Sequence, residues 1–248
     1  MLSSDDAKRT VAQAAVDRYV RDGTCVGLGS GTTAKWAATR VGERIAAGAA
    51  IVAVATSLQT ERLCAAAGVP LVELGERAID VAIDGADEVA PDWSLTKGGG
   101  GALFREKAVA LAAARFVVVV TANKLVERLG AFPTPVEVVP FALRAVTRAL
   151  NDTFPHAAVA LRRSGAETAP FVTDNGNLIL DCAFGTIDDP AALDARIRAV
   201  HGVLDSGLFV GLADAVLVGR ADGRVDELPR SAGSPSSTGT PHERSTLS

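Results

Sequence analysis

The chain has 248 residues, of which 48% are hydrophobic and 22% charged, as in an ordinary globular protein with one large domain or two modest ones. Its net charge of −4 excludes a broad basic field for nucleic acid, so a phosphate group would be bound by a few local cations. No apolar run reaches the roughly 18 residues needed to cross a bilayer, and the N-terminus lacks an apolar signal core. We therefore expect a cytoplasmic protein without nucleic-acid or membrane partners.

The positions of the cysteines support a prediction about their redox state. Cys25, Cys64 and Cys182 lack metal-ligand spacing, and their odd number argues against a disulfide framework, so we expect reduced, buried thiols.

Lysine and arginine together number 25, and only five of these are lysines. In such an arginine-rich chain, lysines can mark places that need a compact ammonium group, although chance substitution explains a single lysine equally well. The lysines are Lys8, Lys35, Lys97, Lys107 and Lys124.

Helices and strands alternate through the first half of the chain. Apolar periodicity predicts helices over residues 5–21, 34–46, 59–67 and 102–114. It predicts strands over residues 24–28, 51–55, 70–74, 79–83 and 116–120. This order indicates an α/β fold with a doubly wound, mainly parallel sheet, in which ligands bind at the carboxyl ends of the strands. Residues 29–33, 84–87 and 121–124 would lie there.

The pattern changes after Gly130. Strands are predicted at residues 136–139 and 159–162, helices at 141–150 and 190–200, and a hairpin around Asn175-Gly176 between 171–173 and 178–180. This indicates a small α+β domain (131–204) inserted into a first domain (1–130 plus 205–227), with residues 208–210 and 215–218 returning to the first sheet. Residues 228–248 are rich in Ser, Pro, Gly and Thr and are predicted to be a disordered tail.

The turn at residues 29–33 suits a phosphate group. Gly29-x-Gly31-x-x-Ala34 fits a loose dinucleotide-binding pattern, but the next predicted strand ends without the carboxylate that such a site requires. Amides and small hydroxyls at the start of a helix suit a monophosphate instead. A glycine turn needed only for the strand-to-helix geometry is the remaining alternative.

Residues 84–107 combine the groups needed to move protons on a small anionic substrate. Asp84 and Asp87 follow an apolar strand, Lys97 precedes the glycines at 98–101, and Glu106 lies near the start of the next helix. Glycines allow backbone N–H groups to converge on an anion. Other interpretations stay open: Asp84 and Asp87 could bind Mg²⁺ or Ca²⁺, Asp84 could instead cap a helix, and Glu106 could belong to a solvated surface. No Gly-x-Ser-x-Gly motif supports triad hydrolysis.

The ordered motifs GLGSGTT, DGADE, KGGGGALFREK, TANKLV, FPTPVEV, TDNGNLILD and GLF resemble ribose-5-phosphate isomerase of type A over residues 5–225. The resemblance implies a Rossmann-like, mainly parallel sheet domain with a small ferredoxin-like lid. It also implies a cofactor-free and metal-free aldose–ketose isomerase of the pentose phosphate pathway. The partner implied is a pentose phosphate, and the usual assembly is a homodimer, with a tetramer as the alternative.

The resemblance also implies roles for individual residues. Glu106 matches the proton-transferring base, with Asp84, Asp87 and Lys97 as the other catalytic groups. The implied substrate-binding residues are Lys8, Ser30, Gly31, Thr32, Thr33, Asp84, Gly85, Ala86, Asp87, Lys97, Gly98, Gly99, Gly100 and Lys124. The sequence departs from the family pattern in reading Gly-Ser-Gly-Thr-Thr in the first loop, in a fourth glycine at Gly101, and in His201 before Gly202.

Two other classes of protein compete with this interpretation. A non-catalytic sugar-phosphate sensor would keep the phosphate loop without needing a base such as Glu106. An amino-sugar phosphate deaminase or a CoA transferase could use a similar scaffold, but deaminase chemistry favours a histidine, and residues 84–124 contain none.

Deleting the residues beyond Leu228 should leave enzymatic activity and the melting temperature unchanged, because this composition cannot form a packed core. Thermal unfolding and an activity assay of the truncated chain would check this. A large loss of either would show that the segment packs against the folded protein.

Overall fold

The computed structural model describes residues 3–165 and 169–229, which form two compact units. The first unit contains residues up to 86, residues 105–125 and residues from 211 onward, and the second contains residues 87–104 and 126–210. The predicted domain boundaries at residues 130 and 204 stay a prediction. The predicted tail lies outside the described residues, apart from Leu228 and Pro229.

The first unit is built on a six-stranded sheet in the order β13-β12-β6-β3-β1-β2. Its pairs are parallel, except that β12 and β13 are antiparallel. The strands are β1 (Cys25–Leu28), β2 (Val52–Ala55), β3 (Val81–Asp84), β6 (Phe116–Thr121), β12 (Ala215–Gly219) and β13 (Val225–Glu227). All residues of β1, β3, β6 and β12 are buried, which explains why these segments read as apolar runs in the sequence.

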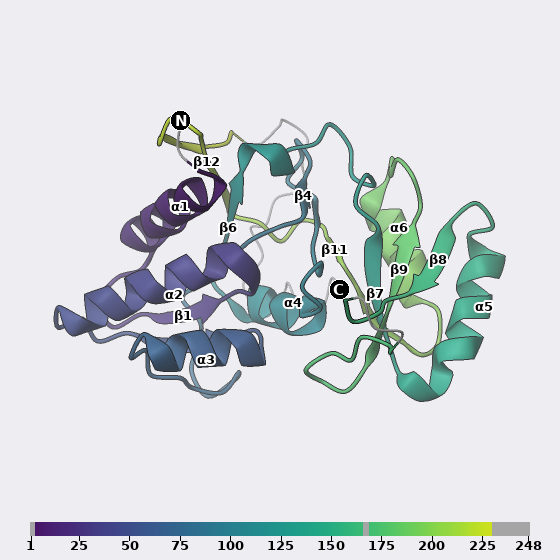
Figure 1. Ribbon diagram of the computed structural model, residues 1–248, viewed down its shortest axis with the longest axis horizontal. Helices are drawn as coiled ribbons and strands as arrows, with labels where there is room; N and C mark the ends of the chain where they lie inside the picture. The colour runs from purple at the N-terminus through teal and green to yellow at the C-terminus, as the bar shows by residue number, and fades with distance from the viewer. Residues whose placement is uncertain (1–2, 166–168, 230–248) are drawn as a thin grey trace. The chain divides into compact units, whose positions relative to one another are not determined.

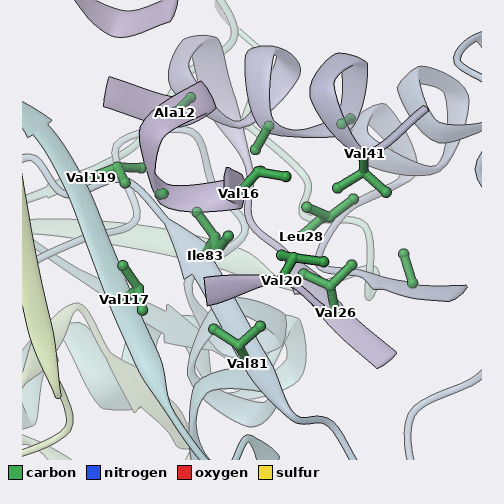
Figure 2. Packing of buried hydrophobic residues seen from close by; sticks show 14 of the residues in the cluster. Ala12, Val16, Val20, Val26, Leu28, Val41, Val81, Ile83, Val117 and Val119 are labelled. Carbon is green, nitrogen blue, oxygen red and sulfur yellow. The ribbon is translucent and has the colours of Figure 1, made fainter. Parts of the chain in front are cut away.

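Helices cover both faces of this sheet. They are α1 (Ser4–Tyr19), α2 (Gly31–Ala46), α3 (Leu58–Ala66) and α4 (Leu103–Ala112) (Figure 1). Val26 and Leu28 of β1 belong to a core cluster with side chains of α1 and α2 (Figure 2). Gly27 points the opposite way, and a Cβ atom there would lie 2.4 Å from Val109 of α4. The sheet is therefore doubly wound, as predicted.

The second unit contains a ferredoxin-like β-α-β-β-α-β arrangement. Its antiparallel sheet has the order β10-β7-β9-β8, and its core cluster joins Val146, Leu150 and Ile197 of the two helices to the sheet. The elements are β7 (Thr134–Val138), α5 (Leu143–Thr153), β8 (Ala158–Leu161), β9 (Leu178–Ala183), α6 (Pro190–Arg198) and β10 (Val203–Ser206). The predicted fold class, a parallel-sheet domain with a small α+β domain, is confirmed.

A third, three-stranded sheet in the second unit was not predicted. It consists of β4 (Glu88–Val89), β5 (Leu95–Thr96) and β11 (Leu208–Phe209) in the order β11-β5-β4. The prediction that residues 208–210 return to the first sheet is therefore wrong. β11 pairs antiparallel with β5 instead, and β12 alone of the two predicted strands joins the six-stranded sheet.

Two other predicted strands are reduced to isolated bridges. Residues 70–74 form two, between Leu71 and Ala53 and between Leu74 and Arg77, because Gly75, with φ of 93°, begins a turn that ends the pairing with β2. Residues 171–173 form only the bridge between Val172 and Leu178. Both edges of β9 are already paired, with β7 and with β8, so the predicted hairpin cannot extend along it.

The three cysteines are free and buried, as predicted. Burial raises the pKa of Cys64 to about 11 and that of Cys182 to about 12, and it also raises the pKa of Cys25. In residues 3–165 and 169–229, no helix combines the length and the apolar character needed to cross a membrane.

A thiol reagent at pH 8 should therefore react slowly with the native protein and rapidly with three equivalents in denaturant, since the thiolate is the reactive form. Because the pKa values are raised on folding, the thiols' contribution to stability is complete below their unfolded pKa and is lost as the pH rises toward 11–12. The denaturation midpoint should therefore be lower at pH 10 than at pH 8. A fast-reacting native thiol would contradict this account.

Candidate active site

The predicted loops of the first unit lie where the sheet reverses its direction of winding. β1 continues through α2 to β2 on one side, whereas β3 continues through α4 to β6 on the other. Leu28 ends β1 and Asp84 ends the adjacent parallel strand β3. In doubly wound sheets, ligands bind in the crevice outside the carboxyl ends of the strands at this switch point.

At this point the backbone of Gly29 meets the carboxyl group of Asp84. The Gly29 N–H donates to the carbonyl of Ile83 at 3.0 Å, and a Cβ atom on Gly29 would lie only 1.9 Å from Asp84 Oδ1. The same Oδ1 accepts hydrogen bonds from the N–H groups of Ser30 (3.1 Å) and Gly85 (2.7 Å). Asp84 is 3% exposed, so its orientation is set by buried backbone donors. The alternative in which Asp84 caps a helix of its own is wrong, because residues 85–87 are not helical.

Hydroxyl groups hold the other side of this loop. Ser30 is the N-cap residue of α2 but makes no side-chain capping bond; its Oγ instead lies 2.7 Å from Thr56 Oγ1. Thr60 donates from Oγ1 to the carbonyl of Gly29 at 2.8 Å. The sequence analysis missed Thr56 and Thr60. The signal for Thr56 was its place directly after β2, since the ends of neighbouring parallel strands meet at one edge.

Glu106 lies in the first turn of α4 and is only 6% exposed. It therefore does not belong to a solvated surface, and the next residue, Lys107, is buried as well, with 4% exposed. Burying a carboxyl group is costly unless it is partnered or used, so its position requires a structural or chemical reason. The role predicted for Glu106 stays a prediction.

The remaining predicted residues of the first unit are partly accessible and lie near the same edge of the sheet. Thr32 is exposed and Thr33 half-buried at the start of α2, and Lys124 ends the short 3-10 helix η1 (Ala122–Lys124) after β6. Lys8 follows Ala7, whose carbonyl packs against Gly219 at the end of β12. Lys8 and Lys124 thus lie beside the carboxyl ends of two neighbouring strands.

The second unit contains Asp87, Lys97 and the glycine loop, residues 98–101. Asp87 accepts a hydrogen bond on Oδ2 from the N–H of Gly99 at 2.8 Å, and a Cβ atom on Gly99 would lie 2.7 Å from Asp87 Oδ1. Gly98 and Gly101 have φ values of 94° and 86°, which favour glycine. Gly99 and Gly100 are exposed. The tip of this turn is therefore accessible, and a carboxylate holds it at Gly99.

Lys97 is buried, with 2% of its surface exposed. Its backbone N–H donates to the carbonyl of Gly207 at 2.8 Å, and its Nζ lies 5.4 Å from the ring centroid of Phe209. A cation at this distance over an aromatic face is attracted by the ring, which offsets part of the cost of removing the ammonium from water. The backbone pairing and the ring together hold Lys97 directly before the glycine loop.

Glu88, the last residue of the DGADE motif, has a structural role that the sequence did not reveal. It is 3% exposed and accepts hydrogen bonds from the hydroxyl of Thr96 and from the N–H groups of Gly130 and Phe132. These bonds attach the loop before β7 to β4. Of the three carboxylates in this motif, Glu88 stabilises the fold, whereas Asp84 and Asp87 lie at either end of the segment that joins β3 to β4.

The predicted residues fall into two sets. The first unit contains Lys8, Ser30, Gly31, Thr32, Thr33, Asp84, Gly85, Ala86, Glu106 and Lys124. The second contains Asp87, Lys97, Gly98, Gly99 and Gly100. Within the described residues, no group of three or more His, Cys, Asp or Glu side chains could hold a metal ion. A metal-free, cofactor-free reaction stays a prediction.

In doubly wound proteins, small anionic ligands commonly bind at the carboxyl edge of the sheet, where glycine turns and helix N-termini offer backbone N–H groups. A family model described as "Ribose 5-phosphate isomerase A (phosphoriboisomerase A)" matches residues 52–223. The chain belongs to the ribose 5-phosphate isomerase A family. The predicted family and enzyme class are thereby confirmed, and the predicted alternative, a non-catalytic sensor, is not favoured.

Individual relatives agree over nearly their whole length. The chain is 46% identical to ribose-5-phosphate isomerase A of Methanothermobacter thermautotrophicus, covering 87% of this chain and 95% of the relative. It is 51% identical to that of Synechococcus sp. (strain WH7803), covering 88% and 92%. The solved ribose 5-phosphate isomerase A of Methanocaldococcus jannaschii has a TM-score of 0.85 at 41% identity, covering 91% and 99%. A D-ribose-5-phosphate isomerase in complex with phospho-erythronic acid has a TM-score of 0.87 at 37% identity, covering 92% and 100%.

Gly29→Ala should lower the stability to unfolding by about 1–3 kcal/mol, because its Cβ atom would displace the carboxyl group of Asp84. Gly85→Ala is the matched control, since its Cβ atom would meet nothing closer than the Val119 carbonyl at 3.7 Å. Urea denaturation of both variants measures the difference. Equal midpoints would contradict the close approach of Gly29 and Asp84.

Proposed function

We propose that this chain interconverts D-ribose 5-phosphate and D-ribulose 5-phosphate through a cis-enediolate, as a step of the non-oxidative pentose phosphate pathway. The observation that carries this proposal is the buried carboxyl group of Glu106 on the first turn of α4, in a member of this isomerase family. The related enzyme bound to phospho-erythronic acid supports a phosphorylated sugar as the ligand.

In the proposed reaction, Glu106 is the base and then the acid. It removes the proton from C2 of the open-chain aldose, and the electron pair moves to form the enediolate. The same group returns the proton to C1 while the hydroxyl proton on the C2 oxygen passes to the C1 oxygen, which produces the ketose without a net change in oxidation state. A positioned carboxylate of this kind contributes about 10²–10⁴-fold to the rate.

The negative charge that develops on the sugar oxygen needs a fixed positive partner. Lys97 and the amides of the glycine loop are assigned this role because a buried ammonium and fixed N–H groups need little reorganisation during the reaction. Asp84 and Asp87 are assigned the sugar hydroxyl groups and assistance in ring opening. The backbone donors that hold each of these carboxylates support such an orienting role.

The phosphate group does not react, and its binding energy anchors the sugar. We assign it to the start of α2, residues 30–33, with Lys8 and Lys124. Two features support this: Ser30 leaves its capping bond unmade, and both lysines lie beside the carboxyl ends of strands. A helix N-terminus whose amides are not capped by a side chain is a suitable donor set for phosphate.

We also propose that the chain forms a homodimer, with a tetramer as the alternative, and that it acts in the cytoplasm. Residues 131–204 are proposed to be a small α+β lid domain, and residues 1–130 with 205–227 the catalytic domain. Light scattering after size-exclusion chromatography would measure the mass of the assembly.

Glu106→Gln should reduce kcat by about 10²–10⁴-fold while binding of a phosphorylated sugar acid stays nearly unchanged. Glu43→Gln, which removes an exposed carboxylate paired with Arg40 on α2, is the control for loss of charge. Turnover of ribose 5-phosphate should be measured in EDTA. Near-normal turnover by Glu106→Gln would remove it from the role of base, and binding without turnover by the unmodified chain would favour a sensor.

A further inference from the structure

Arg162 contacts the glycine loop from the sheet of the second unit. It directly follows β8, and its side chain is 12% exposed. Its Nη1 donates to the carbonyl of Gly98 at 2.8 Å and to the carbonyl of Gly99 at 3.3 Å. The guanidinium group thus binds two successive carbonyl groups of the loop that lies 63–64 residues earlier in the chain.

Asp181 holds the same guanidinium group from the neighbouring strand β9. Arg162 donates from Nε to Asp181 Oδ2 at 3.0 Å and from Nη2 to Oδ1 at 2.5 Å. Asp181 pairs across the sheet with Ala160, so Arg162 is its diagonal neighbour on the same face. Two parallel hydrogen bonds to one carboxylate fix the plane of a guanidinium group, leaving its third nitrogen pointed at the loop.

The carbonyl contacts determine where the amides of the loop point. In a planar trans peptide the C=O and the following N–H point in opposite directions. The carbonyl of Gly98 faces Arg162, and the N–H of Gly99 in the same peptide accordingly donates to Asp87. By the same geometry, the contact to the carbonyl of Gly99 directs the N–H of Gly100 away from Arg162. A Cβ atom at Gly100 would have no heavy atom within 4 Å, so open space surrounds this position.

Phe171 restrains the end of the same loop. A Cβ atom on Gly101 would lie 2.4 Å from the Phe171 ring, so the ring packs directly on the glycine backbone. Phe171 donates its N–H to the carbonyl of Arg162 at 2.9 Å, and the guanidinium lies 5.9 Å from the centre of its ring. Within the loop, the N–H of Gly101 donates to the carbonyl of Gly98 at 2.9 Å. Because four glycines have no side chains to hold them and large backbone freedom, the loop also needs such external contacts to keep one conformation.

We propose that Arg162, oriented by Asp181, is a positioning residue that fixes the peptide planes of the glycine loop and directs the N–H of Gly100 toward the anion that develops on the substrate. This inference rests on the proposed isomerase function. A lysine cannot replace the arginine, because one ammonium cannot bind a carboxylate in two parallel bonds while also binding two carbonyl groups.

The test compares Arg162→Ala, Arg162→Lys and Asp181→Asn with the unmodified chain in ribose 5-phosphate turnover. Each variant should lose about 10–100-fold in kcat with little change in KM, because misplaced donors weaken transition-state binding while the phosphate anchor lies elsewhere. Guanidinium chloride at millimolar concentration should restore part of the kcat of Arg162→Ala. Arg128→Ala is the matched control, since it breaks an exposed arginine–aspartate pair with Asp188 in the same unit.

A kcat-specific loss in Arg162→Lys, with partial rescue of Arg162→Ala, supports the inference; if Arg162→Ala fails to fold, the kcat of Arg162→Lys decides alone. Unchanged kcat in a folded Arg162 variant overturns it, as does a loss that guanidinium does not restore and that follows the melting temperature. If the unmodified chain shows no turnover, the proposed function fails before the variants are compared, so the two failures are distinguishable.

Discussion

The close approach of a backbone to a carboxyl group is the constraint on which the first unit depends. Because β1 and β3 are neighbours at the point where the sheet reverses, the loop after β1 must pass over the end of β3, and only a residue without a Cβ atom fits against Asp84 at Gly29. The N–H of Ser30 in that loop and the N–H of Gly85 after β3 then hold the carboxylate. The absence of a Cβ atom at Gly29 is what allows the loop to pass close enough for the Ser30 contact.

In the second unit the roles are reversed, because side chains there hold a backbone loop in place. There the loop is made of glycines, and side chains hold the backbone: Asp87 binds an N–H group, Arg162 binds two carbonyl groups, and Phe171 packs on the end. Gly29 in the first unit, and Arg162 and Phe171 in the second, carry no proposed reacting group, yet they help to determine where the proposed reacting groups point. Hydrogen-bond donors that stabilise a transition state need such supporting contacts, because a donor that must reorganise stabilises the developing charge less well.

The sequence predicted what local patterns determine and missed what distant pairing determines. The apolar run at 116–120 led directly to β6, whereas the sequence left open whether Glu106 belongs to a solvated surface, and only the structure shows that it is buried. By contrast, Arg162 and Arg163 are adjacent arginines in the sequence, and only the pairing of β8 with β9 shows which of them meets Asp181. The third sheet was missed because β4, β5 and β11 have two residues each, too few for a periodic pattern.

The proposed function requires the loops after β1 and β3 to bind a pentose phosphate. The most direct test is to titrate the isotope-labelled chain with ribose 5-phosphate and follow its backbone amide resonances by NMR. The amides of Thr32 and Gly85 should shift together, with one dissociation constant. Shifts confined to residues elsewhere, such as the exposed face of α5 around Arg148, with these two amides unmoved, would contradict the proposed site.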